Sequence, residues 1–266
     1  LLSVGSDVEK FLQKRADSTN NTLSAKVRGQ IAAIAARNEH AGKFVEQSAT
    51  LMNADNIVVV TPEVQEQYIQ ELIEAGEAIR LSNGRVQFYS NPADVARVPH
   101  RTFVATSKKE NKGKFNKHQL TDNLMTEMMP YFENVFDSKG GEKTLYVIPY
   151  IMEPEGADFD EYNVSFEVTD NRQVVAQMIT MTGVGEEAWR TLGDRSTFKR
   201  GIHLTGDLDN LRRTEPPKPG EKQEGEDDRY FATFPELHLT LSTGSGYGGN
   251  VLLGKKFEGL RVAQYD

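Results

Sequence analysis

A glycine-rich turn between a strand-like and a helix-like segment carries the residues of this sequence best suited to chemistry. The turn runs from Gly244 to Asn250 and has four glycines in its first six residues. Glycines let backbone amides approach an anion closely, and the N-terminus of the following helix adds positive potential, so the turn suits a carboxylate or a phosphate. Lys255 and Lys256, one turn into that helix, would place two ammonium groups near the anion. Their adjacency should lower the pKa of at least one of them, and a neutral lysine can bind a metal ion.

The same segment also fits most of a phosphate-binding loop. Residues 249–255 match the pattern G-x-x-x-x-G-K-[ST] up to its lysine, but Lys256 stands where a serine or threonine would hold Mg²⁺. The second glycine, Gly254, falls inside the predicted helix rather than in a loop. A nucleotide-binding loop and a plain glycine turn with solvated lysines therefore stand as alternatives.

The elements that must position this turn alternate between strand and helix patterns. Apolar runs and period-two alternation predict strands, while capping signals and helical apolar spacing predict helices. Strands are expected at residues 56–60, 85–89, 102–104, 144–150, 164–168, 174–180 and 237–241, the last including His238. Helices are expected at residues 62–75, 120–132, 186–192 and from 251 onward. This order predicts an α/β fold built on a mixed sheet with flanking helices.

The beginning of the chain and one internal segment stand apart from this pattern. Ser6 and Glu9 form a capping-box pattern ahead of apolar residues at helical spacing, so residues 1–54 are expected to form a helical N-terminal arm. Residues 55–266 would then form the main domain. Within it, residues 206–229 are rich in Glu, Lys, Pro and Gly with no apolar period, which predicts a flexible insertion outside the core.

Composition argues against several classes of function. The chain has 266 residues, 38% of them hydrophobic, which is ordinary for a globular protein. Its formal net charge of −8 argues against a nucleic-acid binder, and no apolar run approaches the roughly 18 residues needed to span a membrane. The lack of cysteine excludes disulfides and thiolate metal ligands and favours a cytoplasmic location. The five histidines are scattered, and none is predicted to be a ligand.

Twelve consecutive residues around the turn resemble a known family. Residues 245–256 read SGYGGNVLLGKK and are similar to the substrate-loop signature of phosphoenolpyruvate carboxykinases of the GTP-dependent lineage. Two further blocks agree in order. Residues 94–98 resemble the family's arginine loop, and residues 144–150, 168–170 and 174–176 resemble its central strands. The resemblance covers about residues 56–263.

This resemblance implies an enzyme that interconverts oxaloacetate with phosphoenolpyruvate and CO₂, using GTP or pyrophosphate as phosphoryl donor. It implies that Arg97 clamps a substrate carboxylate or phosphate, that Lys255 supports catalysis, and that Lys256 coordinates Mn²⁺, with Mg²⁺ accompanying the donor. It also implies that Tyr247 lies against the substrate and CO₂ and that Gly249 presents its amide. Gly248 and Asn250 are the other substrate-binding residues that it implies in this loop. Both chemical steps build negative charge, which cations and fixed amides stabilise.

Departures from the family pattern bear on the donor and on the extent of the chain. Residues 151–158 and the acidic, proline-containing insertion are unlike the GTP-dependent members, which favours their pyrophosphate-dependent relatives. The family's nucleotide loop and its metal-binding His and Asp would follow the signature. We therefore expect the N-terminal, substrate-binding portion of a larger enzyme, starting inside it and inactive without the C-terminal remainder. A phosphate-loop nucleotide-binding protein and a non-catalytic interaction module are the alternatives.

Overall fold

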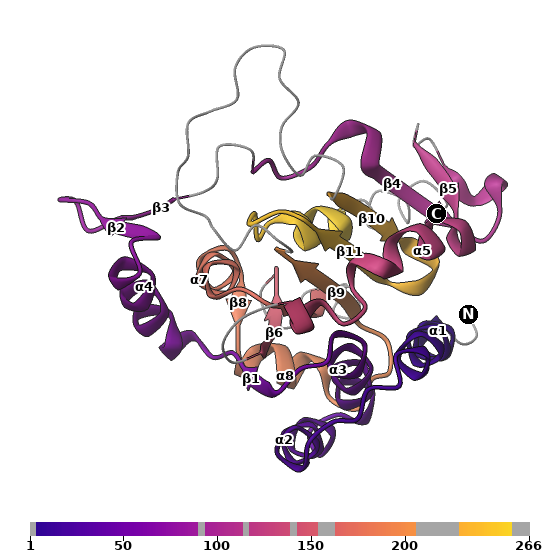
Figure 1. Ribbon diagram of the computed structural model, residues 1–266, viewed down its shortest axis with the longest axis horizontal. Coiled ribbons are helices and arrows are strands. Elements are labelled where there is room, and N and C mark those ends of the chain that lie inside the picture. The colour runs from indigo at the N-terminus through magenta and orange to yellow at the C-terminus, as the bar shows by residue number, and fades with distance from the viewer. Residues whose placement is uncertain are drawn as a thin grey trace.

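The described residues form a mixed sheet of nine strands with helices on both sides (Figure 1). The structure is a computed structural model and describes residues 4–89, 94–113, 117–138, 143–153, 163–205 and 229–256. The strands of the main sheet are β1 (Asn56–Val59), β4 (Thr102–Thr106), β5 (His118–Leu120), β6 (Thr144–Ile151), β7 (Val164–Thr169), β8 (Gly183–Val184), β9 (Lys199–Leu204), β10 (Tyr230–Phe234) and β11 (Leu239–Thr243). A separate hairpin pairs β2 (Ala78–Arg80) with β3 (Val86–Phe88).

The strand order mixes parallel and antiparallel neighbours. It runs β1, β6, β7, β9, β11, β10, β4, β5, and β8 pairs with β6. The pairs β6 with β7 and β10 with β11 are antiparallel, whereas β7 with β9 and β9 with β11 are parallel. The β2–β3 hairpin extends away from the main sheet at one edge of the view (Figure 1). The prediction of an α/β fold with a mixed sheet and flanking helices is confirmed.

Seven labelled α-helices and one further helix accompany these strands in the described ranges. They are α1 (Val4–Ser18), α2 (Ala25–Ala35), α3 (Glu39–Met52), α4 (Gln65–Glu74), α5 (Thr121–Met128), α7 (Arg172–Met181) and α8 (Glu186–Leu192). Residues 250–256 form the further helix, directly after the glycine-rich turn, and we name it the loop helix. None of the helices within these ranges has the length and apolar character needed to cross a membrane.

The two faces of the sheet differ in polarity because side chains alternate along its central strands. The three apolar residues of β7 face one side and its three polar residues face the other: Val164, Phe166 and Val168 against Ser165, Glu167 and Thr169. On the apolar side, α1, α2 and α3 join the sheet in one hydrophobic cluster. On the polar side lie α7 and the loop helix, away from α1 to α3 in Figure 1. The candidate turn therefore belongs to the polar side.

Two of the predicted strand assignments are wrong. Residues 174–180 were expected to be a strand, but they form most of α7, whose N-cap Asn171 accepts a hydrogen bond from the Gln173 amide at 2.7 Å. Its buried residues Val174, Val175 and Met178 pack at helical spacing against β6. A short run of β-branched residues resembles a strand when its cap and its packing surface are unknown. His238 lies in a left-handed turn with φ 47° just before β11, not within a strand.

The predicted insertion is described only at its end. Residues 206–228 lie outside the described residues, so their expected flexibility stays a prediction. Arg229, which the prediction included, is buried, and its Nε donates to the Gly244 carbonyl at 3.0 Å. The prediction is therefore wrong for this residue, because Arg229 is part of the core beneath the turn.

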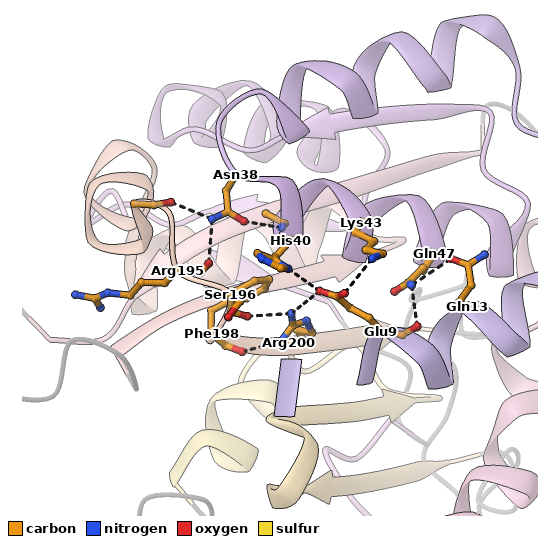
Figure 2. Close-up of polar contacts among 12 residues, drawn as sticks. Glu9, Gln13, Asn38, His40, Lys43, Gln47, Arg195, Ser196, Phe198 and Arg200 are labelled. Atoms are coloured by element: carbon orange, nitrogen blue, oxygen red, sulfur yellow. Dashed lines mark hydrogen bonds and ion pairs between the residues drawn. The ribbon is translucent and has the colours of Figure 1, made fainter. Parts of the chain in front are cut away.

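The N-terminal residues form three helices, as expected, and a group of charges around a buried carboxylate holds the first of them on the sheet. The helix α1 begins at Val4, ahead of Ser6, so the predicted capping box is wrong. Glu9 instead contacts His40 at 2.9 Å, Lys43 at 3.2 Å and Arg200 at 3.7 Å (Figure 2). These contacts join α1, α3 and β9. One hydrophobic cluster contains residues of both the predicted arm, residues 1–54, and the predicted main domain. The division between the two therefore stays a prediction.

Burial and the neighbouring charges shift the pKa values of Glu9 and Arg200. Burial would raise the pKa of Glu9, but hydrogen bonds from His40 and Lys43 outweigh it and hold that pKa below its ordinary value. Burial lowers the pKa of Arg200 to about 10, and Glu9 opposes that change. Arg200 also lies over the Phe198 ring at 4.0 Å and donates to two backbone carbonyls, those of Phe198 and Ser196. Only 1% of the Arg200 side chain is exposed, and the Glu9 carboxylate compensates its positive charge.

We predict that Glu9→Ala lowers the free energy of unfolding by about 3 kcal/mol, because it leaves the buried Arg200 without its carboxylate. Urea denaturation at pH 7 measures the change. Asp7→Ala is the matched control, because Asp7 is an exposed carboxylate on the same helix that contacts Lys10 at 3.9 Å, and it should leave stability nearly unchanged. Equal effects of the two substitutions would contradict the role given to Glu9.

Candidate active site

The first part of the glycine-rich turn is held from below by buried polar side chains. The turn leaves β11 through Gly244 in a left-handed conformation with φ 78°, which glycine adopts without strain. Arg229 donates to the Gly244 carbonyl, and His203 Nε2 donates to the Ser245 carbonyl at 2.7 Å. Burial lowers the pKa of His203, which favours the neutral ring with its proton on Nε2. The start of the turn is therefore anchored to β9 and to the start of β10.

An aspartate from the arginine loop holds the next residue. The Gly246 amide donates to both carboxylate oxygens of Asp94, at 3.3 and 3.1 Å. Burial raises the pKa of Asp94, and the bond from Gly246 with the charge of Arg229 opposes that rise. Asp94 belongs to residues 94–98, which precede β4. The arginine loop and the glycine-rich turn are thus in direct contact.

Tyr247 lies at the middle of the turn with 46% of its surface exposed. Its backbone amide donates to Ser245 Oγ at 3.1 Å. Its ring lies against Gly249, where an added Cβ would approach the ring atoms to 2.7 Å. The Gly248 amide donates to Gln177 Oε1 at 2.8 Å, so it is already used within the protein. Among residues 246–250, the Gly249 amide is the one without a partner in the described part of the chain.

Asn250 begins the loop helix and fixes the position of Arg97. Its Oδ1 accepts from Arg97 Nη1 at 2.8 Å, and its Nδ2 donates to the Ala96 carbonyl at 2.7 Å and to Ser242 Oγ at 2.9 Å. Asn250 is fully buried. The Arg97 guanidinium also lies 5.9 Å from the centre of the Phe231 ring. The Arg97 guanidinium, which the sequence singled out, therefore lies next to the turn.

The two lysines of the loop helix have different surroundings. Lys255 donates to the Asn163 carbonyl and lies 5.7 Å from the centre of the Tyr150 ring. Burial lowers the pKa of Lys255 to about 7, opposed by the charge of Glu153. The expected cause, adjacency to Lys256, is therefore wrong, since burial accounts for the shift. Lys256 is exposed.

The loop helix also decides between the phosphate-loop interpretation and its alternatives. Because the helix begins at Asn250, Gly254 and Lys255 lie inside it and form no anion-binding loop. Gly254 has a packing role instead, since an added Cβ would lie 2.1 Å from Thr240 Oγ1 on β11. The absence of a side chain lets the helix lie directly on the sheet. The phosphate-loop alternative is therefore wrong for this segment.

The polar face beneath the loop helix contains a buried carboxyl group. Glu167 is fully buried, and neither of its carboxyl oxygens has a hydrogen-bond partner among the described residues. Gly201 lies opposite it on β9, and Val251 of the loop helix packs on that glycine. Burial raises the pKa of Glu167 well above its ordinary value, because the charged form loses its hydration. The protein therefore holds this residue preferentially as the neutral acid.

Sequence comparison identifies the family to which this arrangement belongs. The profile of the phosphoenolpyruvate carboxykinase N-terminal domain family matches residues 43–266. The chain belongs to that family. It is 37% identical over 179 residues to a protein of Anaeromyxobacter dehalogenans strain 2CP-C, a match that covers 66% of this chain and 26% of the relative.

Two relatives from Corynebacterium match over more of the chain. The protein of C. jeikeium is 30% identical over 246 residues, which cover 89% of this chain and 38% of the relative. The protein of C. glutamicum is 32% identical over 249 residues, covering 90% and 38%. All three relatives are named phosphoenolpyruvate carboxykinase [GTP]. The chain thus spans between about a quarter and two fifths of their length.

The resemblance to the family predicted most residues of the candidate site, but it did not predict the residues that anchor the glycine-rich turn. The structure brings together five predicted residues at one place: Arg97, Tyr247, Gly248, Gly249 and Asn250. Four residues that anchor the turn were given no role from the sequence: Asp94, Gln177, His203 and Arg229. Alternating polar residues in β7 and β9 could have indicated a polar sheet face. Gln177 had no usable signal, because its segment was taken for a strand.

The described residues do not by themselves complete a metal site for this family. They contain no group of three or more His, Cys, Asp or Glu side chains able to hold a metal ion. Lys256 is the candidate ligand from the sequence, and a single lysine is one donor of the several that Mn²⁺ requires.

We predict that Glu167→Gln makes the protein more stable than the parent at alkaline pH and not at acidic pH. The folded-state pKa is raised, so above the unfolded-state value of about 4.3 only the unfolded chain loses its proton. The parent's free energy of unfolding should then fall with rising pH, by at most about 1.4 kcal/mol per pH unit from this group. The neutral amide avoids this loss.

The measurement is urea denaturation of both proteins between pH 4 and 8.5. Glu46→Gln, on the exposed side of α3, controls for the removal of one negative charge. A difference between the parent and Glu167→Gln that is the same at every pH would show that Glu167 is not held as the neutral acid.

Proposed function

We propose that the protein carrying this chain is a GTP-dependent phosphoenolpyruvate carboxykinase, and that this chain provides its substrate-binding part. Oxaloacetate would lose CO₂ by cleavage of a carbon–carbon bond, and the electron pair left behind forms an enolate. The enolate oxygen then takes the γ-phosphoryl group of GTP, which gives phosphoenolpyruvate and GDP. The observation that carries the proposal is the bond from Arg97 to Asn250, which places a guanidinium beside the glycine-rich turn.

The choice of GTP over pyrophosphate departs from the preference drawn from the sequence. The departures in residues 151–158 and in the insertion favoured pyrophosphate, but the relatives that match are named for GTP. The pyrophosphate preference finds no support in these comparisons. GTP is therefore the donor that we propose, with the nucleotide bound by parts of the protein outside the described residues.

Each proposed role follows from where the side chain lies. Arg97 would pair with a substrate carboxylate or phosphate through the guanidinium nitrogens that Asn250 does not use. Tyr247 would lie against the substrate and CO₂ with the exposed part of its ring. The Gly249 amide would donate to the developing negative charge, whereas the Gly248 amide is bonded to Gln177 and acts through the shape of the turn. Lys255 would add positive potential from the loop helix.

Other parts of the proposal rest on the family rather than on geometry. Mn²⁺ would be the metal at the site, with Lys256 as one ligand, and Mg²⁺ would accompany GTP. The bound metal would supply positive charge for the enolate and the transferred phosphoryl group. The further partners would be oxaloacetate, phosphoenolpyruvate, CO₂ and the C-terminal remainder of the enzyme, with no nucleic acid or membrane among them. The cysteine-free composition supports a cytoplasmic location.

Activity of the full-length protein tests the function directly. Formation of phosphoenolpyruvate from oxaloacetate is measured with GTP and, separately, with pyrophosphate. The reverse reaction is measured as formation of oxaloacetate from phosphoenolpyruvate, CO₂ and GDP. We expect turnover with the guanine nucleotides. Turnover with pyrophosphate but not with GTP would make pyrophosphate the donor. No turnover with either donor would favour the non-catalytic interaction module.

We predict that Arg97→Ala in the full-length protein weakens its handling of oxaloacetate and phosphoenolpyruvate by about 2–5 kcal/mol in kcat/KM, as for the loss of one partner of a buried charge pair. The KM for GTP should change little, since Arg97 would contact only the substrate. Steady-state kinetics for each substrate provide the measurement. Arg85→Ala, an exposed arginine in the β2–β3 hairpin, is the control. Equal losses for substrate and nucleotide would indicate a structural role instead.

We predict that Lys256→Arg in the full-length protein loses nearly all Mn²⁺-dependent turnover and weakens Mn²⁺ binding. A lysine must give up its proton to bind a metal ion, and a guanidinium keeps its proton under all usual conditions. Mn²⁺ titration followed by electron paramagnetic resonance measures binding without requiring activity. Lys109→Arg, at an exposed position before β5, is the matched control. Parent-like Mn²⁺ binding by Lys256→Arg would exclude Lys256 as a ligand.

A further inference from the structure

A single side chain of α7 bonds to the glycine-rich turn on both sides of Tyr247. Gln177 Nε2 donates to the Gly246 carbonyl at 3.2 Å, and Gln177 Oε1 accepts from the Gly248 amide at 2.8 Å. The carbonyl belongs to the peptide group before Tyr247, and the amide belongs to the peptide group after it. Because peptide groups are planar, holding both restricts the backbone rotations of Tyr247 from both ends.

The backbone of residue 247 determines the position of the Tyr247 ring more than it would for a ring enclosed by the core. The ring is 46% exposed and lies along one side against Gly249, so core packing does not enclose it. The remaining contact of its own backbone amide is local, to Ser245 Oγ. The direction in which the ring leaves the turn is therefore set by the two peptide groups that Gln177 holds.

The helix that carries Gln177 is itself firmly seated. Its N-cap Asn171 is satisfied, and Val174, Val175 and Met178 are fully buried against β6. From the other side, Gln65 of α4 donates to the Ala176 carbonyl at 3.1 Å and to Thr180 Oγ1 at 2.8 Å. Gln177 therefore projects from a helix that is tied to the sheet and to α4.

The turn lies close enough to α7 for this contact to be specific. An added Cβ at Gly248 would lie 3.2 Å from Gln177 Oε1 and 3.3 Å from the Val174 carbonyl oxygen. Glycine at this position lets the backbone reach the helix. The other anchors bond elsewhere: Arg229 and His203 hold the carbonyls of Gly244 and Ser245, and Asp94 holds the Gly246 amide. Within the described residues, Gln177 is the side chain that holds the peptide group following Tyr247.

We propose that Gln177 is a positioning residue that sets the orientation of Tyr247 toward the substrate. Its catalytic consequence rests on the proposed function, whereas its effect on the turn does not. Loss of both bonds would widen the range of orientations that the Tyr247 ring takes, although the bonds to Asp94 and Ser245 would remain. Substrate handling would then suffer although no group that contacts the substrate has been removed.

The first experiment needs no activity. Hydrogen exchange of the peptide containing residues 244–250 is compared in the full-length parent, in Gln177→Met, which keeps the side-chain length without the two bonds, and in Gln173→Met. Gln173 is a buried glutamine one turn earlier on α7 with no bond to the turn among the described contacts. We expect about fivefold to tenfold faster exchange at the turn for Gln177→Met, the equivalent of one lost hydrogen bond, and parent-like exchange there for Gln173→Met.

The second experiment separates positioning from general stability. In the full-length enzyme, Gln177→Met should lower kcat/KM for oxaloacetate and phosphoenolpyruvate by about tenfold or more, with the KM for GTP unchanged. Gln177→Glu should fall between parent and Gln177→Met, because it keeps an acceptor for the Gly248 amide and loses the donor to Gly246. Parent-like exchange at the turn in Gln177→Met would overturn the proposal, and so would faster exchange over the whole protein.

The two experiments distinguish failure of this inference from failure of the proposed function. If the parent protein has no carboxykinase activity but the turn exchanges faster in Gln177→Met alone, the proposed function fails and the role of Gln177 in holding the turn stands. If the parent is active and Gln177→Met matches it both in hydrogen exchange at the turn and in kinetics, the proposed function stands and the positioning role is wrong.

Discussion

The side-chain amide of Asn250 is the contact on which the arrangement of the site depends. Its three hydrogen bonds reach Arg97, the backbone of Ala96 and the end of β11 at Ser242. They therefore join the arginine loop, the sheet and the first residue of the loop helix at one buried point. A buried amide left without partners is costly, so the fold must bring all three partners to this point to satisfy it. Arg97, Asp94 and the turn take up their relative positions as a consequence.

The sheet separates two interiors of different character. Its apolar face, covered by α1 to α3, supplies the hydrophobic burial that stabilises the fold. Its polar face holds Glu167, His203 and neighbouring hydroxyl groups beneath the loop helix. Two glycines, Gly201 and Gly254, let that helix lie directly on the sheet. The polar layer is thus enclosed by the protein, which keeps water from the groups that support the turn and strengthens their electrostatic effects.

The sequence was most informative where a residue's role is local and least where it depends on a distant partner. The strands at residues 56–60, 144–150 and 164–168 follow from their own apolar patterns, and the turn follows from its glycines. The helix α7 was mistaken for a strand because its packing surface on β6 is invisible in the sequence. Glu9 was assigned to a local cap, although its partners His40 and Arg200 are 31 and 191 positions away along the chain. A lowered pKa was expected for at least one of the two adjacent lysines, but the burial that lowers the pKa of Lys255 required the fold.

The strand order also determines when the site can form as the chain is made. Arg97 bonds to a residue 153 positions further along, and β4, which follows its loop, pairs with β10. A ribosome adds about 5–20 residues per second, so the arginine loop exists for many seconds before its partner emerges. Parallel strands with distant partners also pair slowly. The contacts that make the site rigid in the folded protein therefore leave one edge of β4 uncovered until β10 has been made, and an uncovered strand edge can pair with another chain in the meantime.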